Sequence, residues 1–446
     1  MPKTKRPVVI LHGYSDKSES FRPLASYLKS HGFQVVDVWL ADYKSMNNEI
    51  TIHDLGQAMG TALKAKKVPE TPGSFDVIVH STGGLVIRAY LQYYFYGRPE
   101  TCPIQHLVML APANFGSPLA RLGKSMIGRL IKGWEWDHFL ETGTRVLEAL
   151  ELGSQVSWDL ARRDLFDPQN PIFRMKNLWT TVLIGSAPYD GIASIAHENG
   201  SDGTVRVSTA HLNARSFQLK FPSSDRSILT EDERFYDPVA FGVLYGQNHS
   251  SICNPNGDSQ KELGDLIVQG LRIEEAEQYL EHLEGLKKIT ARTFARGQAL
   301  TDEKKRNNYH EYQTLVTRVH DQMGENIPDY FMEFFQESKD PNDKVMQAVH
   351  KEILEKVTAF SRDASFRSFL FDVTDIQSMI LGKNLEIDMS LSAAARSERI
   401  FYLNPQAHEV LASRDRGSMA VPNATVFLDI ELQRLQSEDV FRLTRF

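Results

Sequence analysis

Residues 76–88 read Asp-Val-Ile-Val-His-Ser-Thr-Gly-Gly-Leu-Val-Ile-Arg, and this stretch decides the fold. Its first part, from Asp76 to Val79, is a short apolar run rich in β-branched residues, which is typical of a strand buried on both faces. From Leu85 onward the apolar residues recur at the spacing of a helix. A strand followed at once by a helix leaves Ser81 on the turn between them.

This turn has the properties that a reactive serine needs. A tight strand-to-helix turn holds the hydroxyl of Ser81 clear of the backbone, and the free N–H groups of the helix N-terminus favour negative charge. The small residues Gly83 and Gly84 let the helix pack close to the strand. The layout is that of a nucleophile elbow, whose usual pattern is Gly-x-Ser-x-Gly. Val79 replaces the first Gly of that pattern, and an ordinary turn with a capping serine is the alternative.

Length and composition restrict the class of protein. The 446 residues exceed one ordinary domain, and a content of 41% hydrophobic and 24% charged residues is that of a globular protein. The formal net charge of -7 argues against nucleic acid as a partner. The two cysteines, Cys102 and Cys253, cannot make a disulfide framework and do not have metal-ligand spacing.

The sequence shows neither a membrane span nor a secretion signal. No apolar run approaches the roughly 20 residues that cross a bilayer. The basic start, Met-Pro-Lys-Thr-Lys-Arg, is followed by an apolar run, Pro7 to Leu11, that is shorter than the core of a signal peptide. We therefore expect a cytoplasmic protein, although export without a cleaved signal would leave the same sequence.

Strand and helix patterns alternate through the first half of the chain. This alternation predicts a parallel α/β sheet that binds ligands at its carboxyl edge. Strands are predicted at 7–11, 33–39, 76–79, 104–110, 180–184 and 217–221, and helices at 18–30, 52–66 and 259–285. An apolar helical insertion at about 118–170 interrupts the pattern and predicts either a lid or a cap that completes the core.

A serine nucleophile requires a base and an acid, which in this fold class follow the serine in the order acid, then histidine. His249 lies after the last predicted strand and is the best-placed base, with His197 and His211 as rivals. Asp202 leads an Asp-Gly turn into an extended run and is the first candidate for the acid. Asp190 competes with it.

An oxyanion hole needs two backbone N–H groups above the sheet. The residue after the nucleophile, Thr82, offers one of them. The loop after the first strand, His12-Gly13-Tyr14-Ser15, is predicted to offer the other through the N–H of Tyr14.

Five motifs occur in an order that resembles bacterial lipases and esterases of the α/β-hydrolase family. They are His12-Gly13-Tyr14, His80-Ser81-Thr82-Gly83-Gly84, Ala113-Asn114-Phe115-Gly116-Ser117-Pro118-Leu119, Ser201-Asp202-Gly203-Thr204-Val205 and Asn248-His249-Ser250. The resemblance extends from residue 7 to about residue 255 and implies that Ser81 is the nucleophile, Asp202 the acid and His249 the base. Some relatives bind a structural calcium or zinc ion, but no residue cluster in this sequence matches such a site. We therefore expect neither a metal nor another cofactor.

The rest of the chain predicts a second domain. Residues 1–285 are assigned to the catalytic domain, 286–310 to a charged linker, and 311–446 to a β-rich domain that resembles a sandwich. Its strands are predicted at 312–319, 330–335, 366–373, 385–391, 399–402 and 425–432, with the first two forming a hairpin and a helical insertion over 342–358. It has no acid–base constellation, and a stabilising or interaction module is the preferred interpretation, with docking to a membrane or a partner protein as another.

Taken together, these patterns predict a serine hydrolase that cleaves carboxylic esters through an acyl-enzyme. The lid-like insertion favours lipid esters, as in a lipase, phospholipase or esterase. Two alternatives keep the same fold: an acyltransferase, and a catalytically inactive binding protein, for which Val79 is the only hint. The sequence does not specify the acyl chain or the head group.

Overall fold

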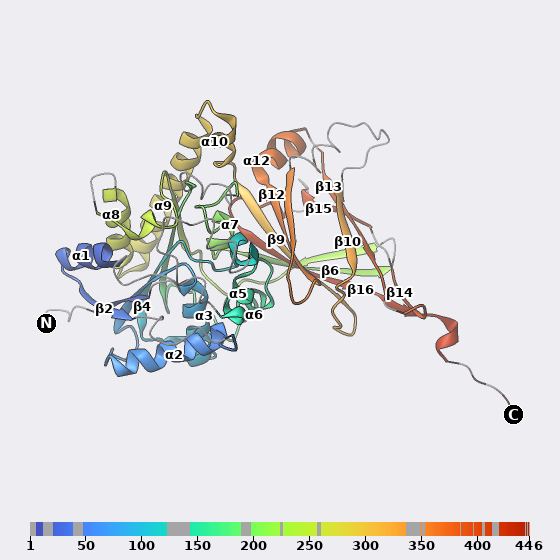
Figure 1. Cartoon of the computed structure of the whole chain (residues 1–446), viewed down its shortest axis with the longest axis horizontal. Coiled ribbons are helices and arrows are strands. Elements are labelled where there is room, and N and C mark those ends of the chain that lie inside the picture. Colours follow the sequence, from blue (N-terminus) through green and yellow to red (C-terminus); the bar gives the residue numbers. More distant parts are fainter. Residues whose placement is uncertain are drawn as a thin grey trace. The chain divides into compact units, whose positions relative to one another are not determined.

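The chain forms two compact units in the computed structural model (Figure 1). Unit 1 comprises Met1–Asn213 and Glu233–His310, and unit 2 comprises Ala214–Asp232 and Glu311–Phe446. The structure describes residues 6–11, 21–38, 48–122, 143–188, 198–223, 226–256, 260–335, 349, 353–383, 385–395, 397–403, 406–412, 419–441, 443 and 445.

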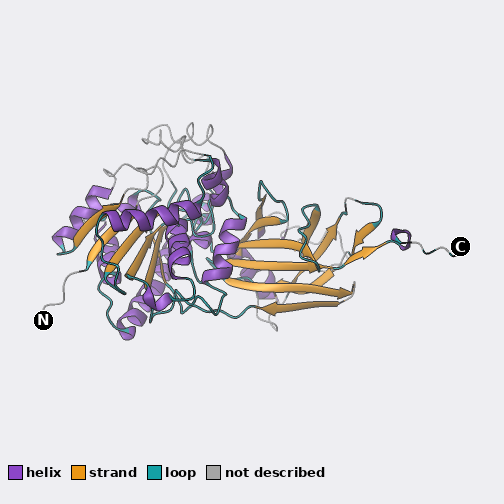
Figure 2. Ribbon diagram, turned by 90° about the horizontal axis from the view of Figure 1, so that it is seen from below, coloured by secondary structure: helices purple, strands orange, loops and turns teal. Residues whose placement is uncertain are grey.

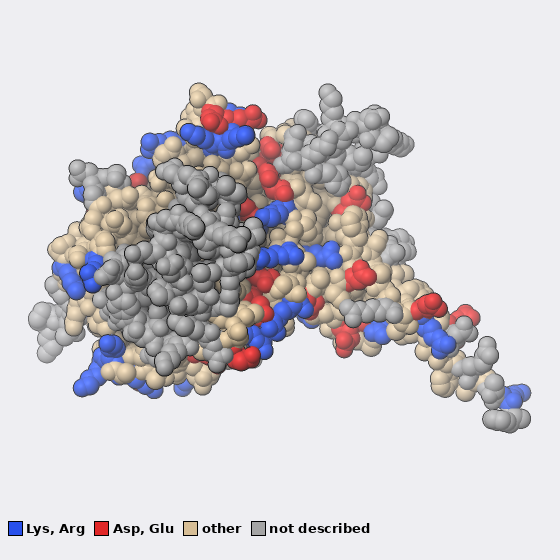
Figure 3. All heavy atoms as spheres, in the orientation of Figure 1, with Lys and Arg blue, Asp and Glu red and all other residues tan. Residues whose placement is uncertain are grey.

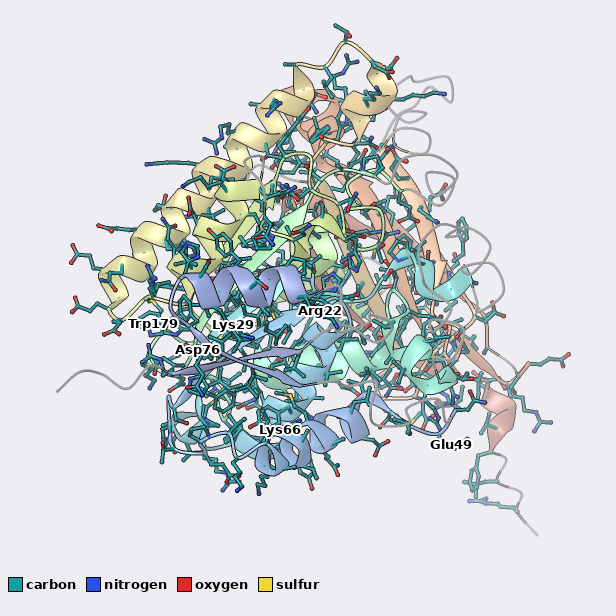
Figure 4. All side chains as sticks on the ribbon, turned by 60° about the vertical axis from the view of Figure 1, so that its left-hand side comes forward. Arg22, Lys29, Glu49, Lys66, Asp76 and Trp179 are labelled. Carbon is teal, nitrogen blue, oxygen red and sulfur yellow. The ribbon has the colours of Figure 1, made fainter. Side chains whose placement is uncertain are left out.

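Unit 1 is built on a six-stranded parallel sheet with the order β2-β1-β3-β4-β5-β8. Its strands are β1 (Pro7–Leu11), β2 (Gln34–Val38), β3 (Phe75–His80), β4 (Ile104–Leu110), β5 (Trp179–Gly185) and β8 (Ala240–Leu244). The central strands β3 and β5 are buried along their whole length, as expected for parallel strands with both faces covered. Figure 4 labels Asp76 of β3 and Trp179 of β5, which lie toward the same end of the sheet because the strands are parallel.

Helices cover both faces of this sheet (Figure 2). On one face α2 (Ile52–Ala65) packs against α3 (Gly83–Phe95). On the other, α1 (Arg22–Ser30) contacts α8 (Lys261–Gly270) through the hydroxyl of Tyr27 and the carboxylate of Asp265, 3.5 Å apart. The other α-helices among the described residues of unit 1 are α5 (Thr144–Leu150), α6 (Gln155–Asp164), α7 (Val207–Ala210), α9 (Ala276–Gln298) and α10 (Glu303–Asn307).

Helix α2 begins at a capping box. The hydroxyl of Thr51 accepts a hydrogen bond from the N–H of Asp54 at 3.2 Å, and the carboxylate of Asp54 accepts one from the N–H of Thr51 at 2.8 Å. Two N–H groups that the helix itself cannot satisfy are thereby paired. The hydrogen bonds from Thr51 also lower the pKa of Asp54.

Unit 2 is a β-sandwich with one apolar core. Its larger sheet has the order β11-β12-β9-β16-β6-β7, and a smaller sheet has the order β10-β13-β15. The strands are β6 (Arg215–Ser223), β7 (Arg226–Glu231), β9 (Tyr312–Asp321), β10 (Tyr330–Phe335), β11 (Leu354–Ala359), β12 (Phe366–Asp372), β13 (Ile387–Ala393), β15 (Gln406–Ala412) and β16 (Thr425–Leu432), and β14 (Ile400–Tyr402) pairs with β17 (Arg434–Gln436). Side chains of both sheets meet in the core, among them Phe334 of β10 and Phe371 of β12, whose rings lie edge to face at 5.0 Å.

The fold confirms the predicted parallel α/β sheet with a β-sandwich beyond it, but three predicted elements have other partners. Residues 217–221 do form a strand, β6, but this strand pairs with β16 of unit 2 instead of the parallel sheet. The sixth strand of that sheet is β8. The predicted hairpin of 312–319 and 330–335 is wrong, because β9 pairs with β12 and β16 whereas β10 pairs with β13.

Two further segments differ in secondary structure. The predicted helix over 342–358 is wrong at its end, where β11 begins at Leu354; most of its earlier part lies outside the described residues. Residues 286–310, predicted to be a linker, belong mainly to α9 and α10 of unit 1. Both errors come from weak local periodicity, since neither a half-exposed edge strand nor a highly charged helix carries a strong apolar pattern.

The insertion predicted at about 118–170 is described in part, because residues 123–142 lie outside the described chain. Its described portion includes α5 and α6, which bury apolar side chains such as Val146, Trp158 and Leu160. Helix α6 packs against α3. Helices α5 and α6 therefore belong to the core. The prediction of a lid remains a prediction for residues 123–142.

None of the described helices is long and apolar enough to cross a bilayer. On the face shown in Figure 3, acidic and basic side chains of the described residues lie interspersed. The described acidic side chains therefore do not form one strongly acidic area on that face.

The histidine of β9 makes the stability of unit 2 depend on pH. Nε2 of His320 lies 3.2 Å from the carboxylate of Asp429, and Nδ1 lies 2.8 Å from the carbonyl of Asp321. Burial and the nearby Arg318 lower the pKa of His320, but these two acceptors outweigh them and raise the pKa above its ordinary value. A raised folded-state pKa stabilises the fold below the unfolded-state pKa of about 6.5, and this stabilisation is lost as pH rises through the folded-state value.

We therefore expect the free energy of unfolding to fall more between about pH 6 and pH 8 in the wild type than in His320→Gln, as measured by urea denaturation. Asp429→Asn removes the charged partner and should weaken the pH dependence in the same way. Equal pH dependence in all three proteins would contradict the assignment.

Candidate active site

Ser81 adopts a strained backbone conformation between β3 and α3. Its φ is 55°, in the left-handed region that residues other than glycine rarely adopt. The main chain around it is fixed on both sides, because the N–H of Ser81 donates to the carbonyl of Leu110 at 3.2 Å and the carbonyl of Ser81 accepts from the N–H of Ala113 at 3.1 Å. The predicted strand–turn–helix geometry is thus present.

Val79 fits this turn because the residues facing it are small. Val79 is fully buried, and a Cβ on Gly83 would lie 3.2 Å from the Cβ of Val79. A Cβ on Gly84 would lie 2.7 Å from the Cβ of Pro112, so this position also has no space for a side chain. Gly83 therefore lets α3 lie close to Val79 of β3, and Gly84 lets it lie close to Pro112 in the segment after β4.

The three side chains predicted for the site lie in one hydrogen-bonded line. Nε2 of His249 is 3.0 Å from Oγ of Ser81, and Nδ1 of His249 is 2.8 Å from Oδ2 of Asp202. His249 is 1% exposed and Asp202 is completely buried. Because Nδ1 faces a carboxylate it carries the proton, which leaves Nε2 of the neutral ring to accept from the hydroxyl of Ser81.

The loop around Asp202 orients this carboxylate. Oδ1 of Asp202 accepts from the N–H groups of Thr204 and Val205 at 2.9 and 2.8 Å, so that Oδ2 is left for His249. The carbonyl of Asp202 accepts from the N–H of His249 at 3.0 Å. Acid and base are therefore joined by main chain as well as by side chains.

The loop of His249 is held by its own polar groups and by the end of β5. The side chain of Asn248 accepts from the N–H groups of Ser250 and Ser251 at 3.0 and 2.9 Å. The carbonyl of Gln247 accepts from the N–H of Ala187 at 2.9 Å. Gly185 lies so close that a Cβ there would be 2.0 Å from the oxygen of Gln247, which fixes the loop against the carboxyl edge of the sheet.

Of the two donors predicted for an oxyanion hole, the structure describes one. Thr82 precedes the first residue of α3, is 5% exposed, and its N–H donates to no other described residue. A free N–H at a helix N-terminus can stabilise an anion. Tyr14, predicted to supply the second donor, lies outside the described residues.

The rivals predicted for the base and the acid are only partly described. His197 and Asp190 lie outside the described residues. His211 stacks on the ring of Phe241 at 3.9 Å and contacts the side chain of Asn213 at 2.8 Å. Of the two described candidates for the base, His249 is the one that contacts the hydroxyl of Ser81.

A buried ion pair that the sequence analysis missed supports the elbow. Arg88 of α3 pairs with both carboxylate oxygens of Asp164 at 2.8 and 3.0 Å, and donates to the carbonyl of Asn114 at 2.6 Å. Both side chains of the pair are at most 1% exposed. Burial raises the pKa of Asp164, and the guanidinium of Arg88 opposes that rise. A charged residue within the apolar run Leu85–Leu91 was the available signal.

A parallel sheet in this order, with a strained serine after its third strand and an acid and a histidine on later loops, is the arrangement of the α/β-hydrolases. The chain has this fold, with a β-sandwich as a second unit. Part of the chain, residues 7–121, matches the family model described as palmitoyl protein thioesterase. No curated protein matches the chain.

Two solved structures resemble almost the whole chain. Phospholipase PlaB from Legionella pneumophila is 24% identical, with a TM-score of 0.83 over 99% of this chain and 96% of that chain. The same phospholipase in complex with thio-NAD is 25% identical, with a TM-score of 0.82 and the same coverage. The similarity extends over both units. The phospholipase and this chain therefore share the combination of a parallel sheet and a β-sandwich.

The ion pair of Arg88 and Asp164 predicts a large effect on stability. We expect Arg88→Met to lower the free energy of unfolding by about 3–5 kcal/mol, because Asp164 would remain buried without its partner. The double variant Arg88→Met/Asp164→Leu removes both charges and should recover most of this loss. Urea denaturation measures both, and a double variant no more stable than the single one would contradict the interpretation.

Proposed function

We propose that this protein is a serine hydrolase of carboxylic esters, with Ser81 as nucleophile, His249 as base and Asp202 as acid. The observation that carries the proposal is the continuous line of hydrogen bonds from Asp202 through His249 to Ser81, at 2.8 and 3.0 Å. The strained φ of 55° at Ser81 supports it, since unfavourable backbone geometry is often kept at functional sites.

The chemistry follows from these positions. Ser81 Oγ attacks the ester carbonyl carbon while its proton passes to Nε2 of His249. The C–O bond to the alcohol then breaks, the alcohol takes the proton from His249, and an acyl-Ser81 ester is left. Water attacks this ester with His249 again as base, which releases the carboxylic acid and restores the serine. Asp202 holds the proton-bearing Nδ1 and stabilises the positive charge that His249 carries in between.

The oxyanion formed in both steps needs fixed donors. We propose the N–H of Thr82, at the N-terminus of α3, as one donor and the N–H of Tyr14 as the other. Each such donor is typically worth about a hundred- to a thousandfold in rate. The dipole of α3 adds to this stabilisation because its positive end lies at Thr82.

Lipid esters are the substrate class that we propose. The similar structure over the whole chain is named a phospholipase, and the matching family model is named for palmitoyl protein thioesterases. One name concerns phospholipids and the other a palmitoyl group, and both are lipid substrates. Turnover of such substrates implies contact with the surface of a membrane or micelle, and the β-sandwich is a candidate for that contact or for a partner protein.

A second candidate is the hydrolysis of long-chain thioesters, which the family match over residues 7–121 favours. The same triad serves both reactions because a thiolate leaves more readily than an alkoxide. Comparison of kcat/KM for a palmitoyl phospholipid and a palmitoyl thioester separates the two, and release of free fatty acid in the presence of added alcohol separates hydrolysis from acyl transfer.

A fluorophosphonate probe tests the nucleophile. We expect the wild type to be labelled and Ser81→Ala to remain unlabelled and lose esterase activity by about a millionfold. Ser74→Ala is the matched control, because Ser74 directly precedes the first residue of β3, at the end of the strand away from Ser81. This variant should be labelled like the wild type. Labelling that persists in Ser81→Ala would refute the assignment, and an unlabelled wild type would favour the inactive binding protein.

Asp202→Asn tests the acid. Oδ1 of Asp202 accepts hydrogen bonds from two N–H groups, and Oδ2 accepts one from His249. The NH2 group of an asparagine at this position would either face these N–H donors or face Nδ1 of His249, which would then have to lose its proton to Nε2. We expect kcat to fall by roughly a thousandfold to ten-thousandfold, since a wrongly oriented base loses most of its effect. Asp167→Asn, at a carboxylate that accepts from the Tyr96 hydroxyl at 2.7 Å, is the control. A large loss in Asp190→Asn with full activity in Asp202→Asn would make Asp190 the acid.

A further inference from the structure

Both main-chain groups of His249 are held by residues of the site. Its N–H donates to the carbonyl of Asp202 at 3.0 Å, and its carbonyl accepts from Nε2 of His80 at 2.9 Å. His80 is the last residue of β3 and directly precedes Ser81. The backbone of the proposed base is thus bound to the acid's residue on one side and to the elbow on the other.

The ring of His80 also lies against the ring of His249. Their centroids are 4.6 Å apart with an angle of 43° between the planes, and the ring of Phe21 lies 5.7 Å from that of His80. His80 is 4% exposed. The main chain of β3 pairs with β1 and β4, so the ring projects from a central strand of the sheet.

We propose that His80 is a positioning residue for the hydrolysis. It ties the loop that carries His249 to the strand that carries Ser81, and thereby maintains the 3.0 Å separation between Nε2 and Oγ. His80 acts through His249 and takes no direct part in the bond changes of the substrate. This inference rests on the proposed function, because a positioned base matters only if Ser81 is the nucleophile.

His249 can act as the base only if its ring is held closely against Ser81. His249 lies on a loop, and loops move more than strands. A bond from the central strand to the base's own carbonyl transfers the rigidity of the sheet to that loop. Without this donor the buried carbonyl is left unpaired, which favours a shifted loop that finds another partner. A displacement on the order of 1 Å can slow a reaction by about a hundredfold.

A pair of substitutions isolates the donor. The side-chain amide of His80→Gln reaches the position of the imidazole Nε2 and keeps a donor for the carbonyl of His249, whereas that of His80→Asn is one methylene too short. Both variants place an uncharged amide at the same buried position. We expect His80→Asn to lower kcat by roughly ten- to a hundredfold with KM within about twofold, and His80→Gln to retain at least about ten times the kcat of His80→Asn.

A third variant separates the ring from the donor. His80→Phe keeps a ring against His249 without an N–H, and its kcat should fall like that of His80→Asn. His282→Phe is the matched control for structural damage, since His282 is also a buried histidine of unit 1 and contacts the hydroxyl of Thr181 through Nε2 at 3.2 Å. It should lower the unfolding temperature without a comparable loss of kcat.

The outcomes distinguish this inference from the proposed function. Hydrolysis of a p-nitrophenyl ester gives kcat and KM, and the rate of fluorophosphonate labelling reports on the reactivity of Ser81. An unlabelled wild type overturns the proposed function and this inference with it. A labelled wild type together with equal kcat in His80→Gln and His80→Asn overturns the inference alone. If His80→Phe does not fold, the Gln and Asn pair still decides.

Discussion

The left-handed turn at Ser81 is the constraint on which the site depends. A residue other than glycine at this φ costs roughly 1–2 kcal/mol, and the chain adopts it because the surroundings leave no alternative. The carbonyl of Leu110 and the N–H of Ala113 hold both peptide groups of the serine, and Gly84 has no space for a side chain against Pro112. The strain turns the hydroxyl away from the strand, toward the edge where the later loops arrive.

Those loops reach the serine through main-chain contacts as much as through side chains. Asp202 and His249 are 47 residues apart and share a backbone hydrogen bond in addition to the hydrogen bond between their side chains. Gly185 allows the loop of His249 to lie directly on the end of β5. A buried polar network of this kind specifies one geometry when its members are paired, because an unpaired buried donor or acceptor is costly. The paired hydrogen bonds of Asp202 and His249 therefore favour a single arrangement of these two residues.

The sequence could predict the line of side chains because the chemistry restricts both residue types and chain order. An elbow serine, an Asp-Gly turn and a late histidine have few alternatives once the strands are placed. The partner of β6 could not be predicted, because residues 217–221 have an ordinary strand pattern. The pairing with β16 places Phe217 opposite Leu428, which is far away in the sequence. The role of Arg88 was missed for a similar reason, since its partner Asp164 lies 76 residues away. Local patterns report burial and period, whereas partners are set by the whole fold.

The chain does not complete one unit before it enters the other. After Asn213 the chain enters unit 2 for β6 and β7, and at Glu233 it returns to unit 1, where β8 and the loop of His249 follow. The base of the site is thus reached through a hairpin whose strand β6 pairs with β16, near the other end of the sequence. Without β16 the strand β6 would pair only with β7, and the backbone groups that now face β16 would form an open edge. The segment that carries His249 therefore follows one that is folded into unit 2, and the chain passes between the two units more than once.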